Sequence, residues 1–85
     1  MRLTKEKAKK FSGWEFRLRN RREKYSHAGK VVSAAVKKSE LRIELDNRSD
    51  YAVSLDDCRR GKRAREGEYS FITRSGDSVL LKRPC

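Results

Sequence analysis

Arginines and lysines in two basic clusters are the residues with the clearest chemical potential in this chain. The first cluster lies in the N-terminal third, and the second occupies the segment 58–66. Their members are Lys9, Lys10, Arg17, Arg19, Arg21, Arg22 and Lys24 in the first cluster, and Arg59, Arg60, Lys62, Arg63 and Arg65 in the second. Arginine outnumbers lysine in both clusters, and its planar guanidinium makes paired hydrogen bonds to phosphate and stacks on bases. The clusters therefore predict phosphate contacts.

Aromatic residues interleave with the first cluster. Trp14, Phe16 and Tyr25 alternate with the basic residues, an arrangement in which bases stack on rings while cations follow a nucleic-acid backbone. Trp14 and Phe16 are the candidate stacking residues. The alternative for both rings is a place in the core, and for Trp14 we favour that alternative.

The charge distribution agrees with a polyanionic partner. The formal net charge is +11, and residues 1–38 carry +10 of it, with 13 lysines and arginines against 3 acidic residues. Such asymmetry is typical of proteins that bind nucleic acid or an acidic protein surface. A membrane partner is not expected, because the basic segment lacks a broad apolar face. If about six to eight cations contact phosphates, the logarithm of the binding constant falls with that of salt at a slope of roughly −5 to −7.

Enzymatic and metal chemistry find little support. His27 is the only histidine, and Asp56-Asp57 are two adjacent carboxylates that a turn explains. Cys58 and Cys85 are too few for a structural zinc site and are expected to be free thiols. We therefore expect no catalytic residue, no metal, no cofactor and no small-molecule substrate.

Length and hydropathy set the remaining bounds. Eighty-five residues suffice for one small domain, in which we expect a basic, mainly helical segment 1–30 and an antiparallel sheet over 31–85. The longest apolar runs are triplets, so neither a membrane span nor a signal peptide is expected, and we predict a cytoplasmic protein. Leu, Ile, Val and Phe supply only 17 of the 85 residues, which predicts a thin core.

Two helices are predicted in the N-terminal segment. Residues 4–11 contain good helix formers, and Ser12-Gly13-Trp14-Glu15 has the form of a capping box that begins a second helix over 14–27, ended by Gly29. The alternative is a strand, since Trp14, Phe16 and Leu18 alternate with polar residues.

From residue 31 onward, the apolar residues alternate with a period of two. This pattern predicts strands over 31–36, 41–45, 51–55, 69–73 and 79–81, with two hairpins and a basic loop over 58–66. One or two helices packed on about five short antiparallel strands make an α+β fold.

Four segments carry a resemblance to a known family: Glu40-Leu-Arg-Ile-Glu-Leu-Asp-Asn-Arg48, Tyr51-Ala-Val-Ser-Leu55, Glu66-Gly-Glu-Tyr-Ser70 and the ending Lys82-Arg-Pro84. Residues 31–84 thereby resemble the bacterial domain of unknown function numbered 2442. Members of that family often show D-G-R where this chain has Asp46-Asn47-Arg48, and W-P where it has Arg83-Pro84. The resemblance implies a small α+β unit and no activity, and it excludes the first 30 residues.

Two functional hypotheses follow. The first is a non-enzymatic module that binds nucleic acid by backbone or shape recognition, with RNA favoured over DNA because arginines and aromatics are mixed. The second is a small regulator or inhibitor of phage or plasmid type that docks on an acidic protein or a ribonucleoprotein.

Overall fold

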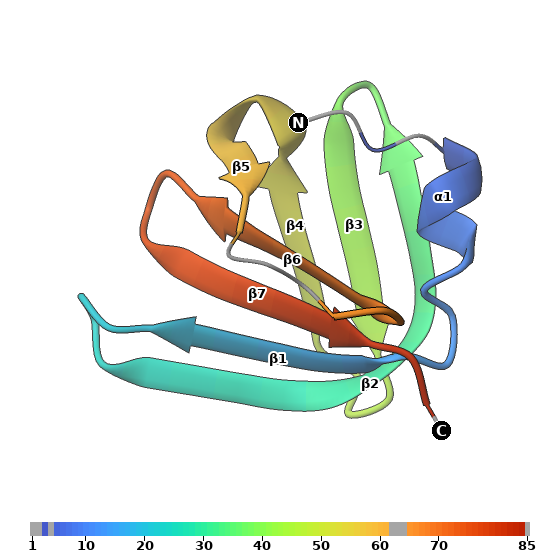
Figure 1. Cartoon of the computed structure of the whole chain (residues 1–85), viewed down its shortest axis with the longest axis horizontal. Helices are drawn as coiled ribbons and strands as arrows, with labels where there is room; N and C mark the ends of the chain where they lie inside the picture. Colours follow the sequence, from blue (N-terminus) through green and yellow to red (C-terminus); the bar gives the residue numbers. More distant parts are fainter. Residues whose placement is uncertain (1–2, 4, 62–64, 85) are drawn as a thin grey trace.

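The computed structural model describes residues 3, 5–61 and 65–84, which form seven β-strands, one short α-helix and one 3-10 turn (Figure 1). In chain order the elements are α1 (Lys5–Lys9), β1 (Glu15–Asn20), β2 (Tyr25–Lys37), β3 (Glu40–Leu45), β4 (Asp50–Ser54), η1 (Leu55–Asp57), β5 (Cys58–Arg60), β6 (Glu68–Thr73) and β7 (Asp77–Lys82). No helix among these residues is long and apolar enough to cross a membrane.

All seven strands belong to one antiparallel sheet, in the order β4-β3-β2-β1-β7-β6-β5. The 13-residue strand β2 is shared: residues 25–30 pair with β1, and residues 31–37 pair with β3. A register shift between Val31 and Ser33 marks the bend in β2. Such bends let a strand pass from one packed sheet to another.

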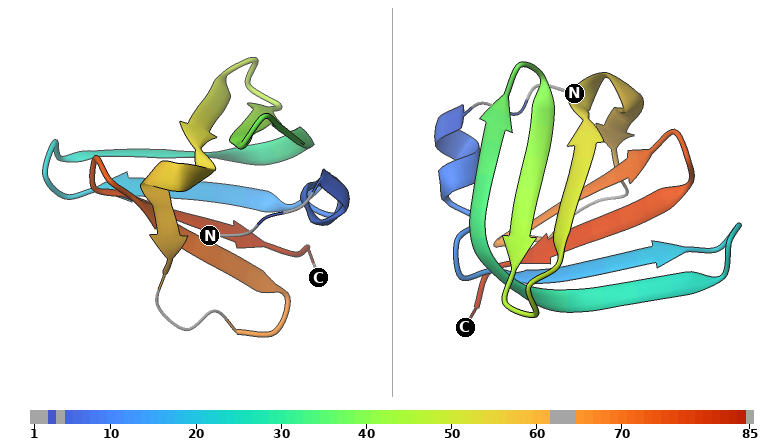
Figure 2. Two further views of the ribbon diagram at one scale, coloured as in Figure 1. Left: turned by 90° about the horizontal axis from the view of Figure 1, so that it is seen from above. Right: turned by 180° about the vertical axis from the view of Figure 1, so that it is seen from behind.

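The bend divides the sheet into two halves that pack face to face (Figure 2). We call residues 25–30 with β1, β7, β6 and β5 the large half-sheet, and residues 31–37 with β3 and β4 the small half-sheet. Strands of the two halves run steeply across one another (Figure 1), and η1 connects β4 to β5 at the ends of the strand order.

The core lies between the half-sheets. The large half-sheet contributes Phe16, Leu18, Phe71, Val79 and Leu81, each at most 5% exposed. The small half-sheet contributes its own buried row from β2 and β3, while Ala8 of α1 and Phe11 of the turn after it are added at one end. These side chains form one hydrophobic cluster, so the two halves stabilise each other.

The α+β prediction is wrong, because the predicted helix over 14–27 is β1 and the beginning of β2. Phe16, Leu18 and Asn20 alternate inward along β1, and a helix would place Phe16 away from Leu18. β1 pairs with β2 on one side and β7 on the other, so the strand alternative is correct. The Ser12 hydroxyl donates to the Val32 carbonyl oxygen instead of capping a helix, and Gly29 lies inside β2.

Several local predictions are confirmed. A helix does form within residues 4–11, as the five-residue α1, and the apolar alternations at 41–45, 69–73 and 79–81 are strands with buried inner rows. The alternation at 51–55 is β4 followed by the first residue of η1. The segment 58–66, expected to be a loop, begins with the short strand β5.

Candidate nucleic-acid interface

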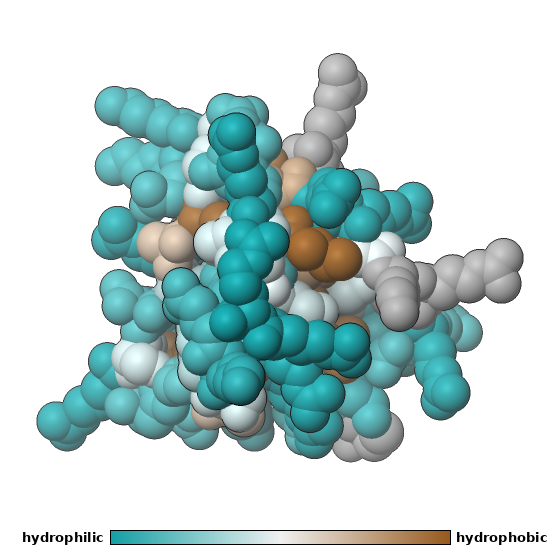
Figure 3. Space-filling model, turned by 90° about the vertical axis from the view of Figure 1, so that its left-hand side faces the viewer, coloured by the Kyte–Doolittle hydropathy of each residue, from teal (hydrophilic) through white to brown (hydrophobic). Residues whose placement is uncertain are grey.

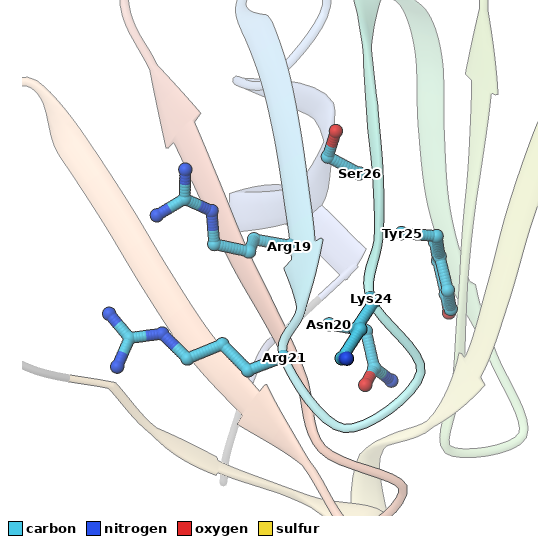
Figure 4. A pocket seen from close by; sticks show the side chains of 6 residues that line it. All are labelled: Arg19, Asn20, Arg21, Lys24, Tyr25 and Ser26. Atoms are coloured by element: carbon cyan, nitrogen blue, oxygen red, sulfur yellow. The ribbon is translucent and has the colours of Figure 1, made fainter.

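The outer face of β1 carries a row of arginines. Because Phe16, Leu18 and Asn20 point into the core, Arg17 and Arg19 point outward and are exposed. Two residues of strand span about 7 Å, which sets the spacing of the row. Arg21 follows at the same spacing in the turn, and Figure 4 shows that the Arg19 and Arg21 side chains extend on the same side. We call Arg17, Arg19 and Arg21 the arginine row.

Small and apolar residues lie beside the arginine row. Arg17 lies between Ala28 of β2 and Leu80 of β7, and Arg19 lies between a serine of each of these strands. The nearest acidic position on this face is Glu15, which is paired across the strands with Lys30 and Lys82.

Among the described residues, the arginine row has no acidic partner. In the described part of the chain, the observed ion pair joins Arg42 to Glu40 at 3.3 Å, on the small half-sheet. Hence no described carboxylate lies within 4 Å of the guanidinium groups of the row, and their charges are available to an external anion.

Besides Arg21 of the row, the turn between β1 and β2 carries two more cations, Arg22 and Lys24. Asn20 shapes this turn, because its side-chain oxygen accepts a hydrogen bond from the Glu23 backbone N–H at 3.0 Å. Lys24 completes the turn in the left-handed region, with φ at 56°. The basic turn is therefore held by a side chain that is itself 2% exposed.

A buried carboxylate holds Asn20 in turn. Oδ1 of Asp77 accepts hydrogen bonds from the Asn20 amide at 2.7 Å and from the Tyr25 hydroxyl at 2.8 Å, while Oδ2 accepts from the Tyr51 hydroxyl at 3.3 Å. These residues come from β1, β2, β4 and β7, so the network joins the two half-sheets. We call Asn20, Tyr25, Tyr51 and Asp77 the Asp77 network.

The Asp77 network raises the pKa of both of its phenols. The hydrogen bond to Asp77, with the further effects of burial and of the Asp77 charge, raises the pKa of Tyr25 above its usual value. Burial, followed by the charge of Asp77, raises the pKa of Tyr51. No buried side-chain nitrogen or oxygen of the described residues lacks a hydrogen-bond partner, which is typical of a network that supports the fold.

Two shallow pockets flank the turn. The first has a volume of about 340 Å³ and is lined by Arg19, Asn20, Arg21, Lys24, Tyr25 and Ser26 (Figure 4). The second, of about 460 Å³, brings Arg22 beside Arg59 and Arg74, with Asp56 and Asp57 also in its lining. Figure 3 shows the side of the molecule with the β1–β2 and β6–β7 turns, where hydrophilic side chains cover most of the surface.

The structure therefore brings together only part of the two predicted clusters. Arg59 of the second cluster lines the same pocket as Arg22 of the first, together with Arg74, which belongs to neither predicted cluster. Arg74 lies in the turn before β7, and the pairing of β7 with β1, in which Asp77 lies opposite Asn20, places it near the β1–β2 turn. Arg60 and Arg65 are exposed but line neither pocket, and Lys62 and Arg63 lie outside the described residues.

Lys9 and Lys10 do not belong to this site. Lys9 ends α1 and Lys10 follows it, and α1 packs against β2. Figures 1 and 2 place α1 at the opposite end of the molecule from the β1–β2 turn in every view. A nucleic acid bound along the arginine row would not reach these lysines unless it extended across the whole molecule.

The predicted stacking residues belong to the core. Phe16 is 1% exposed and packs against Tyr51 with ring centroids 5.6 Å apart, so its ring has no face for a base and that prediction is wrong. Trp14 is partly buried against the core and meets Phe11 edge-on at 5.0 Å, as its interpretation as a core anchor expects. The argument that favoured RNA over DNA therefore loses its aromatic support.

The histidine and the cysteine that could carry other chemistry, His27 and Cys58, lie in surroundings that explain them structurally. His27 Nε2 and the Ser49 hydroxyl are 3.1 Å apart. Cys58 is a buried free thiol whose pKa is raised by burial, and Cys85 lies outside the described residues. The described residues contain no group of three or more His, Cys, Asp or Glu side chains that could hold a metal ion.

No family model, curated protein or solved structure matches this chain significantly. The resemblance of residues 31–84 to domain of unknown function 2442 therefore stays a prediction.

Proposed function

We propose that this protein is a non-enzymatic nucleic-acid-binding protein that recognises the sugar–phosphate backbone. The observation that carries the proposal is the arginine row, an exposed line of guanidinium groups with no acidic partner in the described part of the chain, continued by the basic β1–β2 turn. Phosphates satisfy such groups with charge-assisted, often paired hydrogen bonds.

The number of available cations predicts the salt dependence. Seven cations are candidate contacts: Arg17 on the outer face of β1, and six in the linings of the two pockets, namely Arg19, Arg21, Arg22, Lys24, Arg59 and Arg74. If all seven contact phosphates, counterion release gives a slope of about −5 for a single strand and about −6 for a duplex. Backbone contacts carry no base information, so we expect binding to many sequences, in RNA and DNA alike, and we place the protein in the cytoplasm.

A second candidate function is docking on an acidic protein or ribonucleoprotein, as a regulator of phage or plasmid type. It is supported by a free strand edge. The Val31 N–H donates to the Trp14 carbonyl oxygen, on the side of β1. Backbone groups of successive residues in a strand point to opposite sides, so those of Ser26 and Ala28 point away from β1. No described strand lies on that side of residues 25–30. A partner strand can add to such an edge, and acidic side chains can meet the basic turn.

The test is anisotropy of a labelled oligonucleotide over a salt series. We expect Arg17→Glu with Arg19→Glu to weaken binding at every sequence and to make the slope shallower by about 2. The matched control is Lys37→Glu with Lys38→Glu, which changes the net charge equally at the β2–β3 turn. If the two double variants lose equal affinity, binding depends on net charge alone and the proposed interface is wrong. If wild type binds neither RNA nor DNA at low salt, the proposed function is wrong and an acidic protein partner is favoured.

A further inference from the structure

Tyr25 is the exposed aromatic residue of the described structure. Its side chain is 43% exposed, whereas the other described phenylalanine, tyrosine and tryptophan side chains are buried or partly buried. A large exposed ring is unexpected in a small protein with a thin core, because burying it would contribute to stability. Its position therefore suggests a role in binding.

The ring lies in a cationic setting. Tyr25 lines the 340 Å³ pocket together with Arg19, Arg21 and Lys24. Figure 4 shows Tyr25 on the opposite side of the hairpin from the two arginine side chains, with Lys24 and Asn20 between them. A flexible chain that crosses the turn can contact the cations on one side of the hairpin and the ring on the other. A rigid surface cannot contact both sides at once.

The ring is also held in place. The Tyr25 hydroxyl donates to Asp77 at 2.8 Å, and the Asp77 carboxylate is 7% exposed and bonded to Asn20 as well. The same Asn20 shapes the basic turn through its bond to Glu23. The Asp77 network thus fixes the ring and the adjacent cations relative to each other, which lowers the entropy lost on binding.

We propose that Tyr25 is a stacking platform for one base of a single-stranded nucleic acid whose phosphates contact Arg21 and Lys24. This inference rests on the proposed function and specifies its target. Every base has a π-face, so stacking on the ring is independent of sequence. In a duplex the bases are stacked on one another, so no base face is open to Tyr25 except at the duplex ends. We therefore expect the protein to prefer single strands.

The experiment separates base contacts from phosphate contacts. Anisotropy is measured with a labelled oligonucleotide of about 12 residues and with an abasic chain of the same length and charge, a size within the range of small single-strand sites. Each probe is titrated with wild type, Tyr25→Ala and Tyr25→Phe. Both variants lose the hydroxyl that bonds Asp77, so the difference between them isolates the ring.

We expect wild type and Tyr25→Phe to bind the base-containing strand roughly 5- to 150-fold more tightly than Tyr25→Ala does. On the abasic chain the three proteins bind alike, at the affinity supplied by phosphate contacts. A duplex of the same length binds wild type and Tyr25→Ala equally.

Wild type that binds the abasic chain as tightly as the base-containing strand overturns the stacking proposal and leaves the proposed function standing. Equal losses for Tyr25→Ala and Tyr25→Phe also overturn it, because the lost hydrogen bond is then responsible. Absence of binding to both probes at low salt overturns the proposed function itself. If Tyr25→Ala fails to fold, the comparison of the two probes on wild type still decides.

Discussion

Replacing Asp77 by alanine tests how much the buried polar network that spans the two half-sheets contributes to stability. The Asp77 carboxylate accepts hydrogen bonds from Asn20 at 2.7 Å, Tyr25 at 2.8 Å and Tyr51 at 3.3 Å. Asn20 is 2% exposed, so water cannot readily replace its lost acceptor. Hydrogen bonds to a charged group contribute about 1.5–3 kcal/mol each. Removing the carboxylate also removes the free-energy cost of burying its charge, which offsets part of the loss.

We therefore expect a net loss of about 2–4 kcal/mol in the free energy of unfolding for Asp77→Ala. A chain of this length has a total stability of only about 4–13 kcal/mol. Each kcal/mol shifts the melting temperature of a small domain by about 4–8 °C, so the expected fall is roughly 10–25 °C. The loss is a large fraction of the total because the core is thin.

Circular dichroism followed during heating and urea titration measures this loss. Tyr51→Phe is the graded control, since it removes only the 3.3 Å bond. Because this distance exceeds the usual range of about 2.5–3.0 Å for such bonds, the expected cost is about 0.5–1.5 kcal/mol, below that of a short bond to a charged group. A fall of less than about 5 °C for Asp77→Ala would show that the network contributes under about 1 kcal/mol. The inference that the network stabilises the fold would then be refuted.

Four further predictions address the site and the core. Lys9→Glu with Lys10→Glu is expected to leave the salt slope of oligonucleotide binding unchanged, because α1 lies far from the arginine row; a slope shallower by about 2 would place these lysines in the site. Because the folded pKa of Tyr51 is raised, its contribution to stability is complete below pH 10 and is lost as pH rises further. In urea titrations at alkaline pH, the free energy of unfolding should therefore decline less for Tyr51→Phe than for wild type, and equal declines would contradict this. Phe16→Ala is expected to cost about 3–5 kcal/mol of unfolding free energy in urea, since the ring is 1% exposed; a cost under about 1 kcal/mol would contradict its place in the core. The Cys58 thiol should react with a disulfide reagent near pH 8 only after urea is added, and rapid reaction of the native protein at Cys58 itself would contradict its burial.

The strands after residue 40 could be predicted because their signal is local. Leu41, Ile43 and Leu45 alternate with charged residues, and a strand with one buried face places alternate residues inward whatever its partner is. The turn residues between strands added the hairpins. The same local reasoning did not reveal β5, whose three residues are too few for a period and contain two arginines.

Residues 14–27 show where local pattern is insufficient. Phe11, Trp14, Leu18 and Tyr25 have helical spacing, while Trp14, Phe16 and Leu18 have strand spacing. The choice depends on hydrogen bonds to β7, which lies about 60 residues further along the chain. Pairing on both sides of β1 satisfies its backbone and buries Phe16, and neither gain is visible in the segment itself.

The candidate site divides in the same way. The sequence by itself determined that the protein is strongly basic and that arginines predominate in the clusters, because composition does not depend on the fold. It also determined that Arg17, Arg19 and Arg21 share one side of the chain if the segment is extended, because alternation is a property of neighbouring residues. Only the tertiary structure decided that Phe16 is buried while Tyr25 is exposed, and that Arg22 lies beside Arg59 and Arg74. The reason is that burial and distance between remote side chains depend on which strands pair, and that pairing is chosen by the whole core.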